Sequence, residues 1–203
     1  MENIAKLETR IAKRDRKVPI KTFILVLIFI FVPVFYSHGA EHIVMYRLGS
    51  QDNIAWDQLK RYLGAKGYRI SVYDGTDNIE KHVETVNKIN KLKAAIFLAM
   101  DFGVGEKNQF MVAITTVKKG KGAILAIDEV PALYANESRE LASSLASTFN
   151  KGIKEFPLFP LLGVDMPGIF LKITFTPDKT LEVLNKFHEG IQTYFKRGIK
   201  DER

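Results

Sequence analysis

Cysteine is absent from the 203-residue sequence, tryptophan occurs once and histidine only four times. The lack of cysteine excludes disulfide bonds, thiolate catalysis and cysteine-ligated zinc sites. His82 and His188 fall in amphipathic helical patterns, where surface or half-buried helix positions are a simpler interpretation than metal ligation. Chemistry based on thiols is therefore excluded, and a histidine-rich metal site is not predicted.

Positive charge is unevenly distributed along the chain. Residues 1–40 contain seven Lys or Arg and three Asp or Glu, whereas residues 41–203 contain 23 and 20. The net charge of +7 thus belongs in good part to the N-terminal segment. Nucleic-acid-binding domains have a basic face together with a recognisable binding module. The sequence has no such module, and no nucleic-acid partner is predicted.

One apolar run indicates export. Phe23–Tyr36 (FILVLIFIFVPVFY) is fourteen residues long and follows a basic segment, residues 1–21. A transmembrane helix needs about 20 apolar residues, and a signal peptide has an apolar stretch of about 7–15 followed by a small-residue cleavage site. Residues 22–40 are predicted to be an anchor or a signal peptide, with residues 18–36 contacting the cytoplasmic membrane.

The anchor is favoured because the basic segment is longer than in most signal peptides. Basic segments remain in the cytoplasm, so residues 41–203 are predicted to form a domain outside it, on a single-pass membrane protein. Cleavage within "SHGAEH" would instead make the domain secreted or periplasmic.

Strand and helix patterns alternate along residues 41–203, which is typical of an α/β fold. Strands are predicted at residues 41–48, 68–75, 94–100, 110–117, 122–130 and 169–175, and helices at 53–67, 77–93, 136–153 and 180–197. The predicted fold is a three-layer sandwich, with a largely parallel or mixed central sheet and helices on both faces, preceded by the hydrophobic leader helix.

The order of several segments is informative. Six segments follow one another along the chain: "LKRYLGAKGYRISVY", "INKLKAAIFLAMDF", "NESRELASSL", "VDMPGIFLKITF", "TPDKTL" and "FHEGIQTYF". In order and spacing they resemble the zinc-dependent N-acetylmuramoyl-L-alanine amidases of the amidase-3 type, which cleave peptidoglycan between sugar and stem peptide. The resemblance covers most of residues 42–197. It implies a zinc site of two histidines and a glutamate, with a second glutamate that activates water.

This chain departs from the family at every one of these positions. Gly49 stands at or near the first histidine, Asp101 at the second histidine and Lys172 at the catalytic glutamate. The shortened stretch after Gly49 contains Asp52, a candidate pocket or binding residue, but no glutamate. The resemblance therefore implies a degenerate site without zinc, in which Lys172 and Asp101 form an ion pair that compensates the charge of a lysine among apolar neighbours.

Three hypotheses on function follow. The favoured one is a pseudoenzyme in the cell envelope that binds peptidoglycan or an envelope protein. The alternative is an active cell-wall hydrolase with a relocated site for a hard cation, built on Asp101, Asp128 and Glu129, which each follow an apolar run. The third is a structural envelope component in which the leader is the important part.

Two aromatic residues precede the last predicted strand. Phe156 and Phe159 lie in the segment "FPLFPLLGVDMP", which is rich in proline and predicted to be a loop. They are predicted to be core residues, and the alternative is an exposed rim of a binding surface.

Overall fold

The computed structural model describes residues 40–49, 52–117 and 126–201, which belong to one compact unit. The predictions on residues 1–39, and on residues 122–125 of the strand predicted at 122–130, lie outside the described residues. Within the described part of the chain, no helix is both long enough and apolar enough to span a bilayer.

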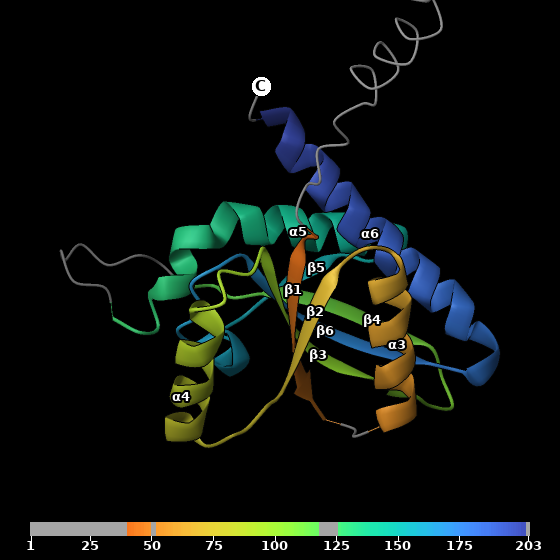
Figure 1. The fold of residues 1–203 in the computed structure, drawn as a ribbon, viewed down its shortest axis with the longest axis horizontal. Helices are drawn as coiled ribbons and strands as arrows, with labels where there is room; N and C mark the ends of the chain where they lie inside the picture. Colours follow the sequence, from red (N-terminus) through yellow and green to blue (C-terminus); the bar gives the residue numbers. More distant parts are fainter. Residues whose placement is uncertain (1–39, 50–51, 118–125, 202–203) are drawn as a thin grey trace, which may run out of the picture. The chain divides into compact units, whose positions relative to one another are not determined.

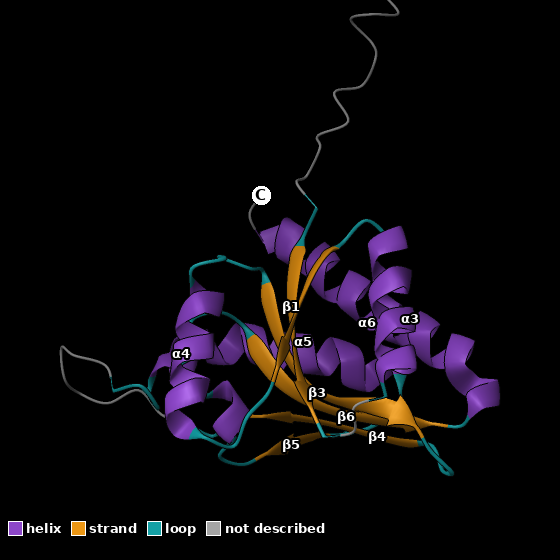
Figure 2. Ribbon diagram, turned by 60° about the horizontal axis from the view of Figure 1, so that its bottom comes forward, coloured by secondary structure: helices purple, strands orange, loops and turns teal. Residues whose placement is uncertain are grey.

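A single mixed sheet forms the centre of the fold (Figure 2). Its strands are β1 (His42–Leu48), β2 (Arg69–Asp74), β3 (Ile96–Val104), β4 (Gln109–Ile114), β5 (Ile153–Glu155) and β6 (Gly168–Phe175). The six strands lie in the order β2-β1-β3-β6-β4-β5. The first four of that order run parallel, β4 is antiparallel to β6, and β5 is parallel to β4.

Helices cover both faces of this sheet, which confirms the predicted α/β class (Figure 1). The helices are α3 (Asn53–Ala65), α4 (Ile79–Asn90), α5 (Ala135–Thr148) and α6 (Thr180–Asp201), with the short turns η1 (Val130–Tyr134), η2 (Phe159–Leu161) and η3 (Pro177–Lys179). The apolar residues of α3, α5 and α6 share one buried cluster with the sheet, and those of α4 and η2 share the other.

Strand alternation divides the core between these two faces, because successive side chains of a strand point to opposite sides. Met45 and Leu98 belong to the cluster under α3, α5 and α6, whereas Val44 and Phe97 belong to the cluster under α4. All four side chains are fully buried. Burial of each such side chain stabilises the fold by about 1.5–3 kcal/mol. The cluster under α4 contains fewer buried residues than the cluster on the other face.

The strand predicted at residues 122–130 is wrong in its described part. Residues 126–129 form a turn, and Val130 begins η1. Ile127 is 43% exposed, so an apolar run here does not correspond to a buried strand.

Among the other boundaries that differ from the prediction, two affect the sheet and the site. The helix predicted to reach residue 153 ends at Thr148, and Asn150 has a φ of 52°, a left-handed conformation that often follows a helix end. This frees residues 153–155 to form β5. β3 in turn continues beyond Met100, because its pairing with β6 extends to Val104. Asp101 therefore lies inside a strand and not after one.

Candidate functional site

The candidate site lies toward the C-terminal ends of β1, β3 and β6. Asp101 is the register partner of Leu48 on one side and of Lys172 on the other. Alternation places Asp101 on the same face as Phe97 and Ala99, which are buried under α4. Asp101 is one step beyond that cluster and keeps a side-chain exposure of 26%. The site is thus a partly open area next to the α4 layer.

The ion pair expected between Lys172 and Asp101 is present. The ammonium nitrogen of Lys172 is 3.4 Å from Oδ2 of Asp101. The side chain of Lys172 is 42% exposed, so the lysine both meets a partner and reaches water. A lysine between apolar neighbours is tolerated here because it stands on the less covered face of the sheet.

Gly49 lies against the Asp101 side of this pair. It has a φ of 66°, and a Cβ built on it would overlap the Asp101 carboxylate. Any side chain at position 49 would therefore need a strained backbone and a displaced Asp101. Gly49, Asp101 and Lys172, which the amidase resemblance assigns to one site, lie together in the structure.

These residues do not fit a zinc ion. Zinc in proteins is held by three or four nitrogen, sulfur or carboxylate ligands. The three positions offer a single carboxylate, which already faces the ammonium group of Lys172. A positive charge at this distance disfavours a second cation.

The alternative cation site is not formed either. In the described ranges, no group of three or more His, Asp or Glu side chains is placed to hold a metal ion. Asp101 faces Lys172, whereas Asp128 and Glu129 lie in the turn before η1 and line a different cavity. The structure does not bring the three carboxylates of the alternative hypothesis together, because Asp128 and Glu129 lie in a turn where a strand was expected.

Asp52 has a structural role. Its Oδ1 accepts a hydrogen bond from the N–H of Ala55 (3.1 Å), which caps the N-terminus of α3. Its Oδ2 accepts from the N–H of Val104 (3.2 Å) and so joins the start of α3 to the end of β3. Both carboxylate oxygens have backbone donors. Aspartate directly before a helical pattern is a capping signal that the sequence already contains.

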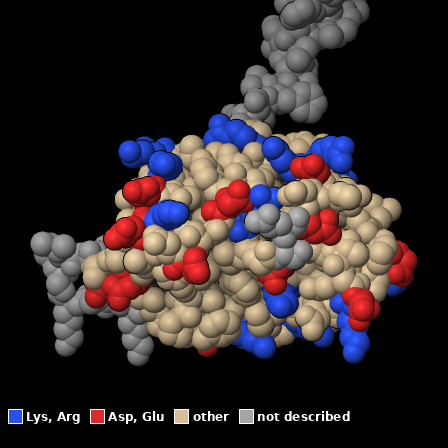
Figure 3. All heavy atoms as spheres, turned by 90° about the horizontal axis from the view of Figure 1, so that it is seen from below, with Lys and Arg blue, Asp and Glu red and all other residues tan. Residues whose placement is uncertain are grey.

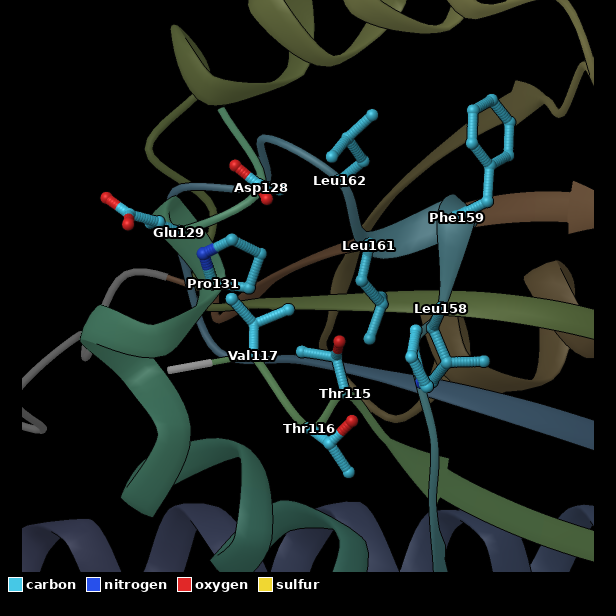
Figure 4. Close-up of a pocket in the computed structure, with 11 residues that line it drawn as sticks. Thr115, Thr116, Val117, Asp128, Glu129, Pro131, Leu158, Phe159, Leu161 and Leu162 are labelled. Carbon is cyan, nitrogen blue, oxygen red and sulfur yellow. The ribbon is translucent and has the colours of Figure 1, made fainter. Parts of the chain in front are cut away.

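Asp128 and Glu129 border a cavity of about 460 Å³ between the end of β4, the turn before η1 and η2 (Figure 4). Leu161 and Thr115 point toward one another across it, and the two carboxylates lie at one side. Oε2 of Glu129 accepts a hydrogen bond from the N–H of Ala126 (3.1 Å), which closes the turn.

The prediction that Phe156 and Phe159 are core residues is wrong. Their exposed fractions are 36% and 38%. Phe159 packs on the imidazole of His82 with ring centroids 4.6 Å apart, and it borders both the cavity at Asp128 and a second cavity of about 320 Å³ next to Gly49. Pro157 and Pro160 interrupt this segment, and Phe159 begins the short turn η2. Phe159 therefore stands on a rim between two cavities.

A buried polar network was missed by the sequence analysis. The Tyr46 hydroxyl is 3.0 Å from Nδ1 of His82, and Nε2 of His82 is 3.0 Å from the carbonyl oxygen of Leu162. Because a carbonyl only accepts, Nε2 carries the hydrogen and Nδ1 accepts from Tyr46. The Tyr46 oxygen accepts in turn from the N–H of Thr76 (3.2 Å). These bonds fasten α4 and η2 to β1.

Burial determines how this network titrates. His82 is fully buried, which lowers its pKa below the ordinary value because imidazolium loses hydration, while the hydrogen bond to Leu162 acts in the opposite direction. Burial raises the pKa of Tyr46 for the corresponding reason, and the hydrogen bond from Thr76 opposes that effect. Both groups are therefore neutral near pH 7.

Charged residues on the face seen from below in Figure 1 are of both signs. Lysine and arginine alternate with aspartate and glutamate over the described residues visible there (Figure 3). No charge of one sign dominates the described residues of that face.

Comparison with known proteins gives a likeness at the level of fold. No family profile matches the chain, and neither does any curated protein. An N-acetylmuramoyl-L-alanine amidase from Clostridium difficile 630 is 13% identical with a TM-score of 0.42, over 77% of this chain and 97% of that one. The catalytic domain of the CD27L endolysin targeting Clostridia difficile is 10% identical with a TM-score of 0.46, over 79% and 97%.

The N-acetylmuramoyl-L-alanine amidase AmiC2 of Nostoc punctiforme is 11% identical with a TM-score of 0.44, over 77% of this chain and 98% of that one. Similarity at this level describes the arrangement of strands and helices and carries no argument about catalysis, metal or ligand.

Proposed function

We propose that this chain is a non-catalytic, amidase-like domain that binds peptidoglycan in the cell envelope. The observation that carries the proposal is the convergence of Gly49, Asp101 and Lys172 toward the C-terminal ends of parallel strands. Ligands of α/β sheets bind outside these strand ends. The three positions are also the ones that the resemblance assigns to the metal and the base of an amidase.

The chemistry of the three residues favours binding over hydrolysis. A lysine ammonium donates hydrogen bonds and has no lone pair with which to take a proton from water. Asp101 is the one carboxylate among them, and the ammonium lies against it. Without a metal and a base, the site has no means of activating water.

The same pair is suited to a ligand rich in hydroxyl and amide groups. Lys172 presents donors and Asp101 presents acceptors, and both side chains are partly exposed. Sugar hydroxyls and peptide amides are donors and acceptors at once, and can bridge the two side chains.

The location in the envelope rests on the sequence before the domain. In this proposal residues 18–36 hold the chain in the cytoplasmic membrane, with residues 41–203 outside. Support comes from the apolar run after a basic segment. If the leader is cleaved, the same domain is secreted or periplasmic. Carbonate extraction of membranes separates the two forms, since an anchored chain stays in the pellet.

The test is cosedimentation of the full chain, kept in a non-ionic detergent, with insoluble peptidoglycan. We expect the wild type to pellet and Asp101→Ala and Lys172→Ala to pellet less. Lys60→Ala, which removes an exposed lysine on α3, is the matched control and should bind as the wild type does. Release of stem peptides in the presence of zinc would overturn the non-catalytic assignment. Absence of wild-type binding would overturn peptidoglycan as the ligand and favour an envelope protein.

A further inference from the structure

Three lysines line one cavity next to the candidate site. The cavity has a volume of about 380 Å³ and lies at β4 and the adjoining strands, with Lys151, Lys154 and Lys172 in its wall. Lys172 pairs in register with Met111 of β4, and Lys154 with Ala113. Met111 and Ala113 are two residues apart, so Lys172 and Lys154 stand on the same face of the sheet, on either side of β4.

Of the three lysines, only Lys172 has an acidic partner in the described part of the chain. Asp101 forms the ion pair with Lys172. Glu155 follows Lys154 in β5, so it points to the opposite face, where it pairs with Arg139 at 2.7 Å. Among the described residues, no carboxylate lies within ion-pair distance of Lys151 or Lys154. The cavity wall thus has two positive charges without an acidic partner.

The amide of Asn108 adds a further donor. Its Oδ1 accepts a hydrogen bond from the backbone N–H of Thr176 (2.9 Å), which fixes the orientation of the amide. The oxygen is thereby occupied, and the NH₂ group remains to donate within the cavity that Asn108 lines. Asn108 and the three lysines therefore present donors to this cavity, and the three lysines are cationic.

We propose that this cavity binds phosphate groups of an anionic ligand with at least two negative charges. A single carboxylate would balance only one of the two unpaired lysines, whereas a phosphate monoester or two successive phosphates balance both. Lysine is a common phosphate partner that acts as a point charge. The inference goes beyond peptidoglycan binding, since Lys151 and Lys154 are not part of the Gly49–Asp101–Lys172 site.

The experiment is calorimetric titration of the full chain, in a non-ionic detergent, with inorganic tripolyphosphate. Lys151→Gln and Lys154→Gln should each weaken binding by about tenfold, because each removes a charge-assisted hydrogen bond. Lys60→Gln removes the same charge from α3 and should leave affinity unchanged, which controls for net charge. The basic N-terminal segment is identical in all variants, so it does not contribute to the differences between them. Affinity should fall as salt is raised.

Three outcomes would overturn the proposal. The first is that the wild type does not bind tripolyphosphate. The second is that both cavity variants bind it with the affinity of the wild type. The third is that a Glu-Glu peptide binds more tightly than tripolyphosphate. The last outcome would assign the cavity to carboxylates. Lys154→Gln is also expected to leave peptidoglycan cosedimentation unchanged, so that failure of one proposal is distinguishable from failure of the other.

Discussion

Lys172 lies opposite Asp101 in the register of β6 and β3, and its ammonium nitrogen is 3.4 Å from the Asp101 carboxylate. Because both side chains are partly exposed, water screens the pair. A double-mutant cycle with Asp101→Asn and Lys172→Gln should give a coupling free energy below about 1 kcal/mol in urea unfolding. A coupling of several kcal/mol would contradict this and would mean that the pair is buried in solution.

Gly49 is expected to be intolerant of any side chain. Gly49→Ala places a Cβ against the Asp101 carboxylate at a φ of 66°, and the strain should lower the free energy of unfolding by about 1–3 kcal/mol. Gly64, in the last turn of α3, has open space around its Cβ position, so Gly64→Ala should raise the free energy of unfolding by about 0.5 kcal/mol. Equal effects at the two positions in urea unfolding would refute the close contact.

Ser138 fixes the start of the strand that carries Lys172. Its hydroxyl oxygen accepts a buried hydrogen bond of 3.0 Å from the N–H of Gly168. Ser138→Ala leaves this N–H without a partner and should cost about 1–3 kcal/mol in thermal or urea unfolding. Ser143 is exposed on the same helix, and Ser143→Ala should change stability by less than about 0.5 kcal/mol.

His82 should make stability depend on pH. Burial lowers the pKa of His82 in the folded state below the ordinary value of 6.5 that it has in the unfolded chain. Between these two pKa values the unfolded chain binds more protons, so the free energy of unfolding falls as the pH drops below about 6.5. The pKa values of His42 and His188 are also lowered, mainly by burial, and act in the same direction.

The test is urea unfolding of the wild type and two variants between about pH 8 and pH 5. His82→Gln retains an amide that can replace both hydrogen bonds but does not titrate, so its profile should be flatter. His188→Gln, at a half-buried position, should flatten the profile less. A wild-type profile that rises toward acid pH would show that His82 is charged in the folded protein.

Local patterns in the sequence predicted the helices and strands correctly where the periodic apolar residues are also the buried ones. The apolar strand β1 and the amphipathic helices α3 and α6 lie close to their predicted bounds. The run at residues 122–130 has strand-like composition, yet Ile127 is exposed in a turn. Whether an apolar residue is buried depends on what packs on it, and composition does not contain that information.

The residues of the candidate site were predictable from the sequence, but their exposure to solvent was not. The resemblance brought Asp101 and Lys172 into one site, and their pairing followed from opposite charge. Their exposure did not follow, because it depends on where α4 ends relative to strands far away in the sequence. The Tyr46–His82 contact joins β1 to α4 across 36 residues and has no local signal.

The unequal sizes of the two buried clusters have a consequence for motion. α4 and η2 cover the smaller cluster and are fastened to β1 through the hydrogen bonds of His82. Layers with fewer buried contacts open at lower free energy than the rest of a fold. Amide hydrogens of α4 should therefore exchange with solvent before those of β3. Local opening is then expected first on the face of the sheet that carries Phe159 and the candidate site. The face covered by α3, α5 and α6 should open at higher free energy.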